Sequence, residues 1–263
     1  MLTMDLGLTG RTFLLTGASQ GLGLAAAEAL VAEGATVVLS ARDEGRLAAA
    51  VTHLGSDRAV AIAADLADPA SAERLVAGTV GRFGRLDGTL ISVGGPAVGT
   101  PMSVTDEQWR AAFESVHLGA VRLMRAVASA ATVDPDSTSG TGASILAVLS
   151  TSAKSPISGL TASNGLRPGL GMLVKDFADE LGPRGIRVNG VLPGRIATDR
   201  TLALDASMGN AQAARRRNEA AIPLGRYGDP REFGSLAAFL LSPAASFING
   251  SLIPVDGGSL RAL

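Results

Sequence analysis

The chain has no cysteine and few aromatic residues among its 263 positions. The lack of cysteine excludes disulfides, thiolate nucleophiles and cysteine–zinc sites, and it suits the reducing cytoplasm, where we expect this protein. We expect no metal site. Aromatic residues make up 3% of the chain, with one tryptophan and one tyrosine. Any chemistry that needs a phenol hydroxyl therefore depends on a single position, Tyr227.

Neither sign of charge dominates, and no apolar run has the length of a membrane span. Lys and Arg number 23 against 24 Asp and Glu, for a formal net charge of −1. This balance gives no field that attracts nucleic acid or an anionic membrane. The apolar stretches are of strand length or carry charges at helical spacing. Residues 1–11 lack the charged start and apolar core of a signal peptide. We therefore expect the partner to be a small-molecule substrate, with no nucleic acid and no membrane.

Short β-branched runs alternate with longer amphipathic segments along the chain, of which 46% is hydrophobic. The predicted strands are 11–16, 36–40, 59–64, 88–93, 144–149, 186–192 and 251–255. The predicted helices are 23–33, 43–54, 68–83, one within 106–131, 166–182 and one near 230–241. Strands joined by helix-length crossovers pair in parallel through right-handed connections. The sequence thus predicts a single α/β domain over 1–263, a Rossmann-type, doubly wound parallel seven-stranded sheet in three α/β/α layers.

Other segments carry more local expectations. In the fourth helix, Trp109, Phe113 and Val116 begin an apolar series that falls on one helical face. Residues 134–142 are polar and rich in helix breakers, which predicts a surface loop. Residues 198–221 predict a mostly helical excursion between the sixth strand and the last helix.

The turn after the first strand reads TGASQGLG over residues 16–23. Gly17 allows a tight turn, Gly21 lets the backbone approach a pyrophosphate, and Gly23 lets the following helix pack close to the sheet. The N-terminus of that helix would direct its free N–H groups at the phosphates. Glycine-rich turns also serve purely structural ends, but the position between a strand and a helix favours a nucleotide site.

The spacing T-G-x-x-x-G-x-G resembles the short-chain dehydrogenase/reductase family, and further matches follow in order along nearly the whole chain. They are Asp65-Leu66 after the third strand, Gly94-Gly95 after the fourth, Pro193-Gly194 with Thr198 after the sixth, and Asn249-Gly250 and VDGG at 255–258 near the C-terminus. Residues 92–95 read SVGG where the family has Asn-Asn-Ala-Gly. The resemblance implies the fold predicted above and a nicotinamide dinucleotide cofactor, and its C-terminal match implies a homodimer or homotetramer.

The resemblance also implies the cofactor contacts and a substrate lid at about residues 198–221. The implied contacts are Gly17, Ser19, Gln20, Gly21, Leu22 and Gly23 in the turn, Arg42 after the second strand, Asp65 and Leu66 by the adenine, Gly94 and Gly95 after the fourth strand, Arg167 near the nicotinamide ribose, and Pro193, Gly194, Ile196 and Thr198 by the carboxamide.

The end of the second strand predicts the choice of cofactor. An acidic residue there binds the ribose 2′-hydroxyl of NAD, whereas a base pairs with the 2′-phosphate of NADP. This chain has Ala41-Arg42, and an arginine fork suits a phosphate. We therefore expect NADP(H) in preference to NAD(H). The alternative is that Arg42 is a solvated arginine, and Gln20 stands where NADP users often carry a second base.

The catalytic pattern of the family is incomplete in this chain. The resemblance places Ser150 on the family's catalytic serine, but Ser163 on its tyrosine and Arg167 on its lysine. Tyr227 lies in a Gly/Pro-rich turn that matches a loop far from the active site, so no tyrosine is available. A subgroup that resembles ketoacyl reductases carries S-x-x-x-K-x-P-I and S-N-x-L-R instead, and SNGLR at 163–167 fits that pattern.

Several residues are candidates for the missing acid. Lys154, four residues after Ser150, would act as an acid or a polarising cation if it were desolvated, and otherwise it is a surface-loop lysine. Arg167 can stabilise an oxyanion but cannot donate its proton, and the hydroxyl of Ser163 is a poorer acid than a phenol. His117 titrates in a suitable range, although we favour its facing water or another subunit. The run of arginines at 215–217 is expected to be a solvated face.

These observations predict an NADP(H)-dependent oxidoreductase that reduces a ketone to an alcohol, with Ser150 and Lys154 as the rearranged proton-donor site. Two alternatives remain open. One is a non-redox enzyme, such as a cyclase, isomerase or lyase, that reuses the same pocket. The other is a catalytically inactive protein that keeps the cofactor for stability or as a scaffold.

Overall fold

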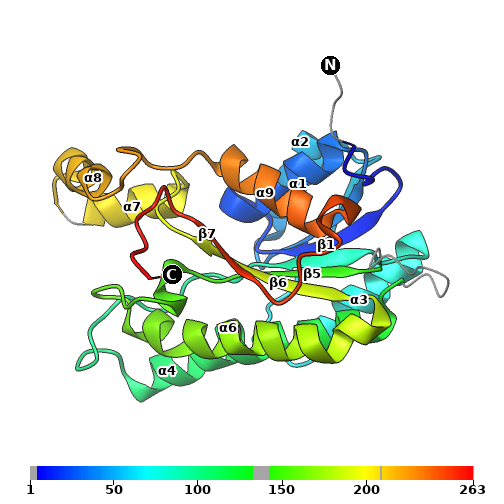
Figure 1. Cartoon of the computed structure of the whole chain (residues 1–263), viewed down its shortest axis with the longest axis horizontal. Helices are drawn as coiled ribbons and strands as arrows, with labels where there is room; N and C mark the ends of the chain where they lie inside the picture. Colours follow the sequence, from blue (N-terminus) through cyan, green and yellow to red (C-terminus); the bar gives the residue numbers. More distant parts are fainter. Residues whose placement is uncertain (1–4, 133–141, 208, 263) are drawn as a thin grey trace.

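The computed structural model describes residues 5–132, 142–207 and 209–262 of the chain, and these form three α/β/α layers (Figure 1). The central sheet has seven parallel strands in the order β3-β2-β1-β4-β5-β6-β7. The strands are β1 Thr12–Thr16, β2 Thr36–Ser40, β3 Ala59–Ala61, β4 Gly88–Ile91, β5 Ser144–Val148, β6 Arg187–Pro193 and β7 Leu252–Val255. The predicted doubly wound parallel sheet is therefore confirmed.

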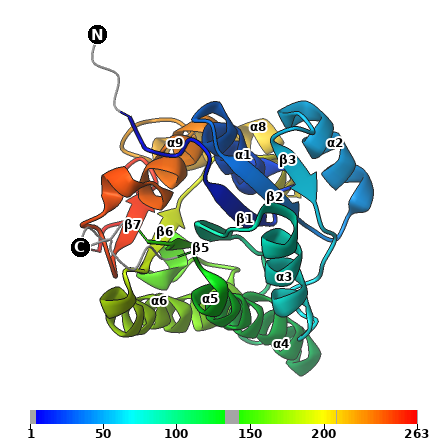
Figure 2. The ribbon, with the colours of Figure 1, turned by 90° about the vertical axis from the view of Figure 1, so that its right-hand side faces the viewer.

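Helices cover both faces of the sheet (Figure 2). One face carries α1 Gly21–Ala32, α2 Glu44–Leu54 and α9 Pro230–Leu241. The other carries α3 Ser71–Phe83, α5 Gly119–Ala130 and α6 Thr161–Leu181. Strands β1, β4 and β5 are buried throughout, as continuous apolar runs between two helical layers require. Within the described ranges, no helix combines the length and apolar character needed to cross a membrane.

The helix predicted within 106–131 is not continuous. It consists of α4 Asp106–Ala112, a π-helical segment Phe113–Leu118, and then α5. A π-helical turn adds residues to each turn and so shifts the phase of the face that follows. Val116 is buried as predicted, but Phe113 is 42% exposed. The single apolar face expected for this helix is therefore wrong at Phe113.

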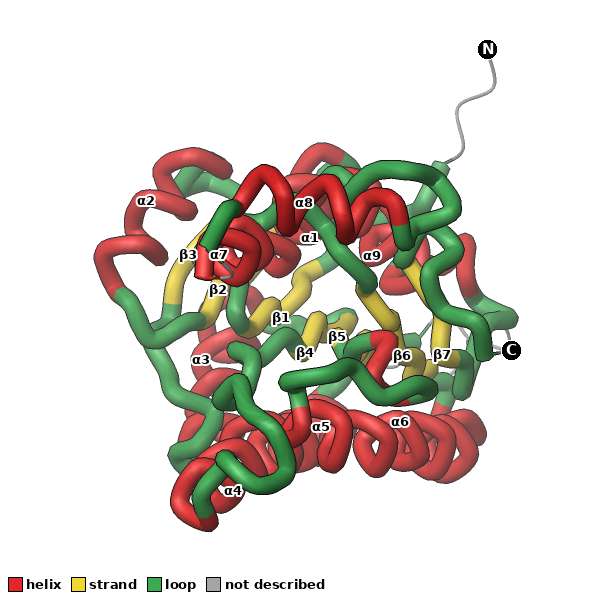
Figure 3. The backbone as a smooth tube through the Cα atoms, turned by 90° about the vertical axis from the view of Figure 1, so that its left-hand side faces the viewer, coloured by secondary structure: helices red, strands yellow, loops and turns green. Residues whose placement is uncertain are grey.

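Two other boundaries differ from the sequence prediction. The third strand ends at Ala61, although Ile62 N and Ala64 N still donate to the carbonyls of Leu39 and Ala41 at 2.9 and 3.0 Å. The excursion after β6 is mostly helical, as predicted, and divides into α7 Asp199–Ser207 and α8 Ala211–Ala220 (Figure 3). The surface loop predicted for 134–142 lies, except for Gly142, outside the described residues.

Candidate active site

The predicted cofactor residues gather at the carboxyl edge of the sheet, where the chain after β1 and the chain after β4 lead to helices on opposite faces. The order of strands reverses between these two neighbours, and open α/β sheets bind ligands at such a switch point. Thr16 ends β1 and Ser92 follows β4, and hydrogen bonds between these two residues join the strands at this edge. Thr16 Oγ1 donates to Ser92 O at 2.8 Å and accepts from Ser92 N at 3.0 Å.

The glycine turn between β1 and α1 has the geometry of a phosphate cradle. Gly17 has φ +59°, and a Cβ on it would lie 2.7 Å from Ser92 O. A Cβ on Gly23 would collide with the carbonyl of Gly17, so the helix approaches the turn more closely than any other residue permits. Gln20 makes no side-chain cap, and the first turn of α1 holds no acidic residue. The N–H groups of that turn are therefore left for an anion, which fits the diphosphate of a dinucleotide.

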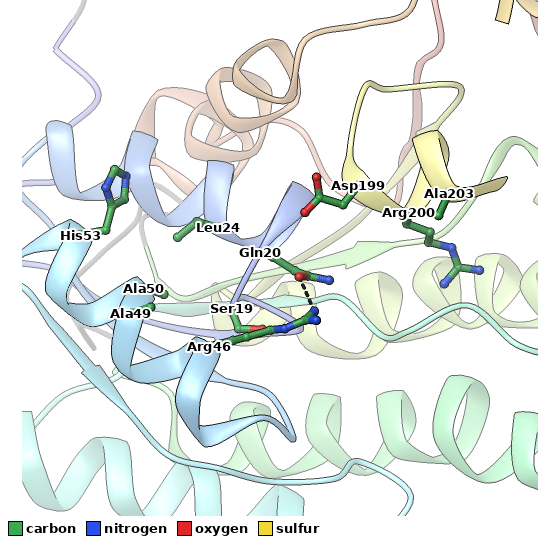
Figure 4. Close-up of a pocket in the computed structure, with 10 residues that line it drawn as sticks. All are labelled: Ser19, Gln20, Leu24, Arg46, Ala49, Ala50, His53, Asp199, Arg200 and Ala203. Carbon is green, nitrogen blue, oxygen red and sulfur yellow. Dashed lines mark hydrogen bonds between the residues drawn. The ribbon is translucent and has the colours of Figure 1, made fainter. Parts of the chain in front are cut away.

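The structure adds an arginine that the sequence analysis missed. Arg46 on α2 donates from Nη1 to Oε1 of Gln20 at 2.6 Å (Figure 4). Gln20 is uncharged and stands where NADP users often carry a second base, and Arg46 places a positive charge beside it. Arg42 is 79% exposed in its side chain and lies 4.0 Å from Oδ2 of Asp65, so two predicted cofactor residues meet here. The sequence offered one signal for Arg46, which lies four residues after Arg42. Its contact with Gln20 could not be predicted, because that contact depends on how α2 packs.

Ser150 follows β5 and begins the 3₁₀ turn Thr151–Ala153. Its Oγ accepts from Ser152 N at 3.1 Å, and its own hydroxyl proton has no acceptor among the described residues. Ser163 is buried, and its Oγ lies 2.9 Å from Oγ of Ser152. The structure therefore joins Ser150 and Ser163 through Ser152, and it leaves the hydroxyl proton of Ser150 without an acceptor among the described residues.

Arg167 lies one helical turn after Ser163 on α6, with its guanidinium group buried against the end of β5. Nη1 donates to the carbonyl of Val148, and Nε has no partner within the described part of the chain. Burial, reinforced by the positive charge of Arg200, lowers the pKa of Arg167 to about 10. The positive charge expected at this edge of the sheet is present, and no carboxylate of the described residues forms an ion pair with it.

Two candidate acids are placed less favourably. Lys154 ends the 3₁₀ turn after Ser150 and is exposed, so the desolvation that would make it an acid is not present in this structure. The ring of His117 stacks on Phe113, with centroids 5.3 Å apart. A Cβ on Gly169 of α6 would lie 3.5 Å from Cε1 of His117. His117 thus packs on α6 two residues beyond Arg167, away from the face that carries Arg167.

The single tyrosine is held in the segment that follows β6. Tyr227 is 4% exposed, donates its hydroxyl to Asp205 Oδ2 at 2.7 Å, and accepts from Asn218 Nδ2 at 3.0 Å. Burial, followed by the hydrogen bond to Asp205, raises its pKa. Arg215 lies over the ring, 5.2 Å from its centroid, and pairs with Glu219. Arg215 is therefore engaged with Tyr227, which corrects the expectation that residues 215–217 are simply a solvated face.

The remaining predicted contacts follow several different strands, and the structure places them in different surroundings. Thr198 packs on it, since a Cβ on Gly21 would lie 3.6 Å from the methyl group of Thr198. Gly194 N donates to Val255 O at 3.0 Å, which brings the C-terminal segment to the end of β6. Ile196 is buried, whereas Ser19 and Leu22 are partly exposed. Gly94 borders open space. The backbone of Leu66 packs against Gly119 at the start of α5. Within the described ranges, no cluster of His, Asp or Glu is arranged to hold a metal ion.

Comparisons with known proteins agree with this fold and this arrangement. A family described as enoyl-(acyl carrier protein) reductase matches residues 17–259. The 3-oxoacyl-(acyl-carrier-protein) reductase FabG of Vibrio cholerae is 32% identical, over 95% of this chain and 98% of its own. The structure of L-sorbose reductase from Gluconobacter frateurii, complexed with NADPH and L-sorbose, is similar with a TM-score of 0.90 at 30% identity, covering 99% of this chain and 100% of that one.

A short-chain dehydrogenase/reductase from Brucella melitensis, described as a glucose/ribitol dehydrogenase, has a TM-score of 0.89 at 32% identity, covering 98% of this chain and 100% of its own. Both the sequence and the fold are thus matched across nearly the full length. The chain belongs to the short-chain dehydrogenase/reductase family.

Proposed function

We propose that this protein is an NADP(H)-dependent oxidoreductase that reduces a ketone to an alcohol at a site without tyrosine. The observation that carries the proposal is the hydroxyl of Ser150, which is oriented by Ser152 N and has no acceptor of its own within the described residues. It lies at the same sheet edge as the glycine turn and the buried Arg167. The similar L-sorbose reductase, solved with NADPH and L-sorbose, supports both the cofactor and the class of reaction.

The chain has residues suited to each part of the cofactor. The glycine turn and the N-terminus of α1 would hold the diphosphate, and Thr198 packs against that turn. Arg42 and Arg46 would hold the 2′-phosphate that distinguishes NADP from NAD. Asp65 would contact the adenine. When bound, NADPH supplies a hydride to the carbonyl carbon of the substrate.

The residues of the protein would then stabilise the negative charge that develops on the substrate oxygen. Ser150 would donate its hydroxyl proton to that oxygen. The positive charge of Arg167 would stabilise the negative charge that develops on the oxygen before the proton is transferred. We assign to Lys154, four residues further and open to solvent, the return of a proton to Ser150. Ser163 is a positioning residue in this scheme, because its hydroxyl holds Ser152. Helices α7 and α8, within 198–221, would form the lid over the substrate.

The test is NADPH-dependent reduction of a panel of ketones by the parent and by Ser150→Ala and Lys154→Ala. Loss of an oxyanion donor lowers kcat by about 10²–10³-fold, which we expect for Ser150→Ala with NADPH affinity retained. Because Lys154 is open to solvent, water can also return the proton, so we expect Lys154→Ala to lower kcat less than Ser150→Ala does. Lys175→Ala is the matched control, because Lys175 pairs with Asp179 on the surface of α6 and should leave kcat unchanged.

The same experiment distinguishes the alternatives. Oxidation of NADPH in step with alcohol formation supports the proposal. Turnover that continues without any nicotinamide would favour a non-redox enzyme that reuses the pocket. Binding of NADPH with no turnover of any ketone would favour a scaffold protein that keeps its cofactor.

A further inference from the structure

Arg200 occupies the second position of α7 and reaches the loop after β4. A Cβ on Gly95 would overlap its guanidinium group, so this group lies directly on the backbone of Gly95. Arg200 lines the same pocket as Gln20 and Arg46, and its side chain extends away from these two residues (Figure 4). No hydrogen bond or ion pair joins Arg200 to another of the described residues. Although much of the side chain is exposed, partial burial lowers the pKa of Arg200.

A second unpaired arginine lies at the same edge of the sheet. Arg167 is fixed through Nη1 to the carbonyl of Val148 at the end of β5, and its buried Nε has no partner within the described ranges. Strand β5 pairs with β4, whose chain continues to Gly95. The two guanidinium groups are close enough that the charge of Arg200 contributes to lowering the pKa of Arg167.

Arg167 is buried and Arg200 is partly buried, so two cations near each other with no carboxylate of the described residues between them carry an electrostatic cost. The acid next in sequence, Asp199, does not relieve it, because its side chain is directed toward Gln20 and away from the guanidinium group of Arg200 (Figure 4). An anionic ligand between Arg167 and Arg200 would supply the missing charge. Arginine forks match the two oxygens of a carboxylate, and a buried charged hydrogen bond is stronger than a neutral one.

We propose that Arg200 and Arg167 bind a carboxylate group of the substrate, so that this enzyme reduces oxo acids rather than neutral ketones. The inference rests on the proposed reduction and names its substrate class. The diphosphate of the cofactor is the other anion that could reach this region. We favour the substrate because the glycine turn and the N-terminus of α1 already suit the diphosphate, and Thr198, rather than Arg200, packs on Gly21.

The experiment compares straight-chain 2-, 3- and 4-oxo acids with their methyl esters. Binding of each compound is measured by calorimetry with and without NADPH, and turnover is measured in parallel. The variants are Arg200→Gln, Arg200→Lys and the matched control Arg82→Gln, which removes an exposed arginine of α3. The Kd of NADPH is measured for every variant, so that contacts with the cofactor are separated from contacts with the substrate.

For the parent, we expect at least one acid to bind about 10- to 150-fold more tightly than its ester, the range that a charged hydrogen bond provides. Arg200→Gln should bring this ratio close to one, Arg200→Lys should restore part of it, and Arg82→Gln should leave it unchanged. No acid binding better than its ester, or an Arg200→Gln variant that loses only NADPH affinity, would overturn the inference. Acids that bind selectively without oxidising NADPH would instead overturn the proposed reduction and leave the anion site standing.

Discussion

Arg167 and Tyr227 both lie in surroundings that are unusual for their residue type. Arginine is usually a surface residue, yet Arg167 is buried at the end of β5. Tyrosine is the usual proton donor of the family, yet Tyr227 is enclosed between α7, α8 and the turn before α9. Its hydroxyl satisfies the buried carboxylate of Asp205, so we expect it to contribute to stability rather than to chemistry.

The first prediction concerns Tyr227→Phe. Removal of the hydroxyl leaves Asp205 and Asn218 without one partner, which should lower the free energy of unfolding by about 1–3 kcal/mol. Urea unfolding measures this loss, and kcat for NADPH-dependent reduction should stay unchanged. A large loss of kcat with unchanged stability would show that this tyrosine takes part in the reaction after all.

At the scale of elements, helix α9 is fixed to α1, the helix that presents the glycine turn. Gly234 allows this contact, because a Cβ there would collide with the carbonyl of Ala25. The N-terminus of α9 is closed by a capping box, in which Asp229 accepts from Arg231 N at 2.8 Å and Glu232 accepts from Asp229 N at 2.7 Å. Such reciprocal caps satisfy the free N–H groups of the first turn.

The capping box gives a second prediction, on acid stability. The hydrogen bond from Arg231 lowers the pKa of Asp229 to about 2, and the hydrogen bond from Arg226 lowers that of Glu232 to about 2. Because both folded pKa values are depressed, the stabilisation is complete above the unfolded values near 4 and is lost as the pH falls through about 2. Asp229→Asn should therefore flatten the fall in unfolding temperature between these pH values. Asp57→Asn, at an exposed carboxylate, serves as the control, and an equal flattening there would refute the assignment.

The fold class and the order of strands and helices along the chain could be predicted because strand and helix periods are local properties of the sequence. The same holds for the glycine turn, whose residues are contiguous. Contacts between distant elements could not be predicted in this way. Arg46 meets Gln20, and Arg200 covers Gly95, only because α2 and α7 pack where they do. The phase change at Phe113 was missed because a π-helical turn leaves no periodic signal in a short segment.

The third prediction concerns assembly. Phe113, Met172 and Phe247 are large apolar side chains with exposed fractions of 42%, 69% and 103% in the single chain. Apolar side chains left exposed in this way favour interfaces between subunits. We therefore expect a homodimer or homotetramer, with two or four chain masses by light scattering after size-exclusion chromatography. A monomer at micromolar concentration would contradict this expectation.

The central claim is tested most directly by titrating NADPH and NADH into the parent, Arg46→Gln and Arg42→Gln, with Arg82→Gln on α3 as the control. Each arginine that contacts a phosphate contributes a charged hydrogen bond, so we expect each of the two variants to weaken NADPH binding by about 10-fold or more. NADH binding should stay unchanged in both variants, and the control should match the parent. Tight NADPH binding that depends on Arg42 and Arg46 is the result we predict. Equal affinity for the two cofactors in every variant, or no binding of either, would contradict an NADP(H)-dependent enzyme.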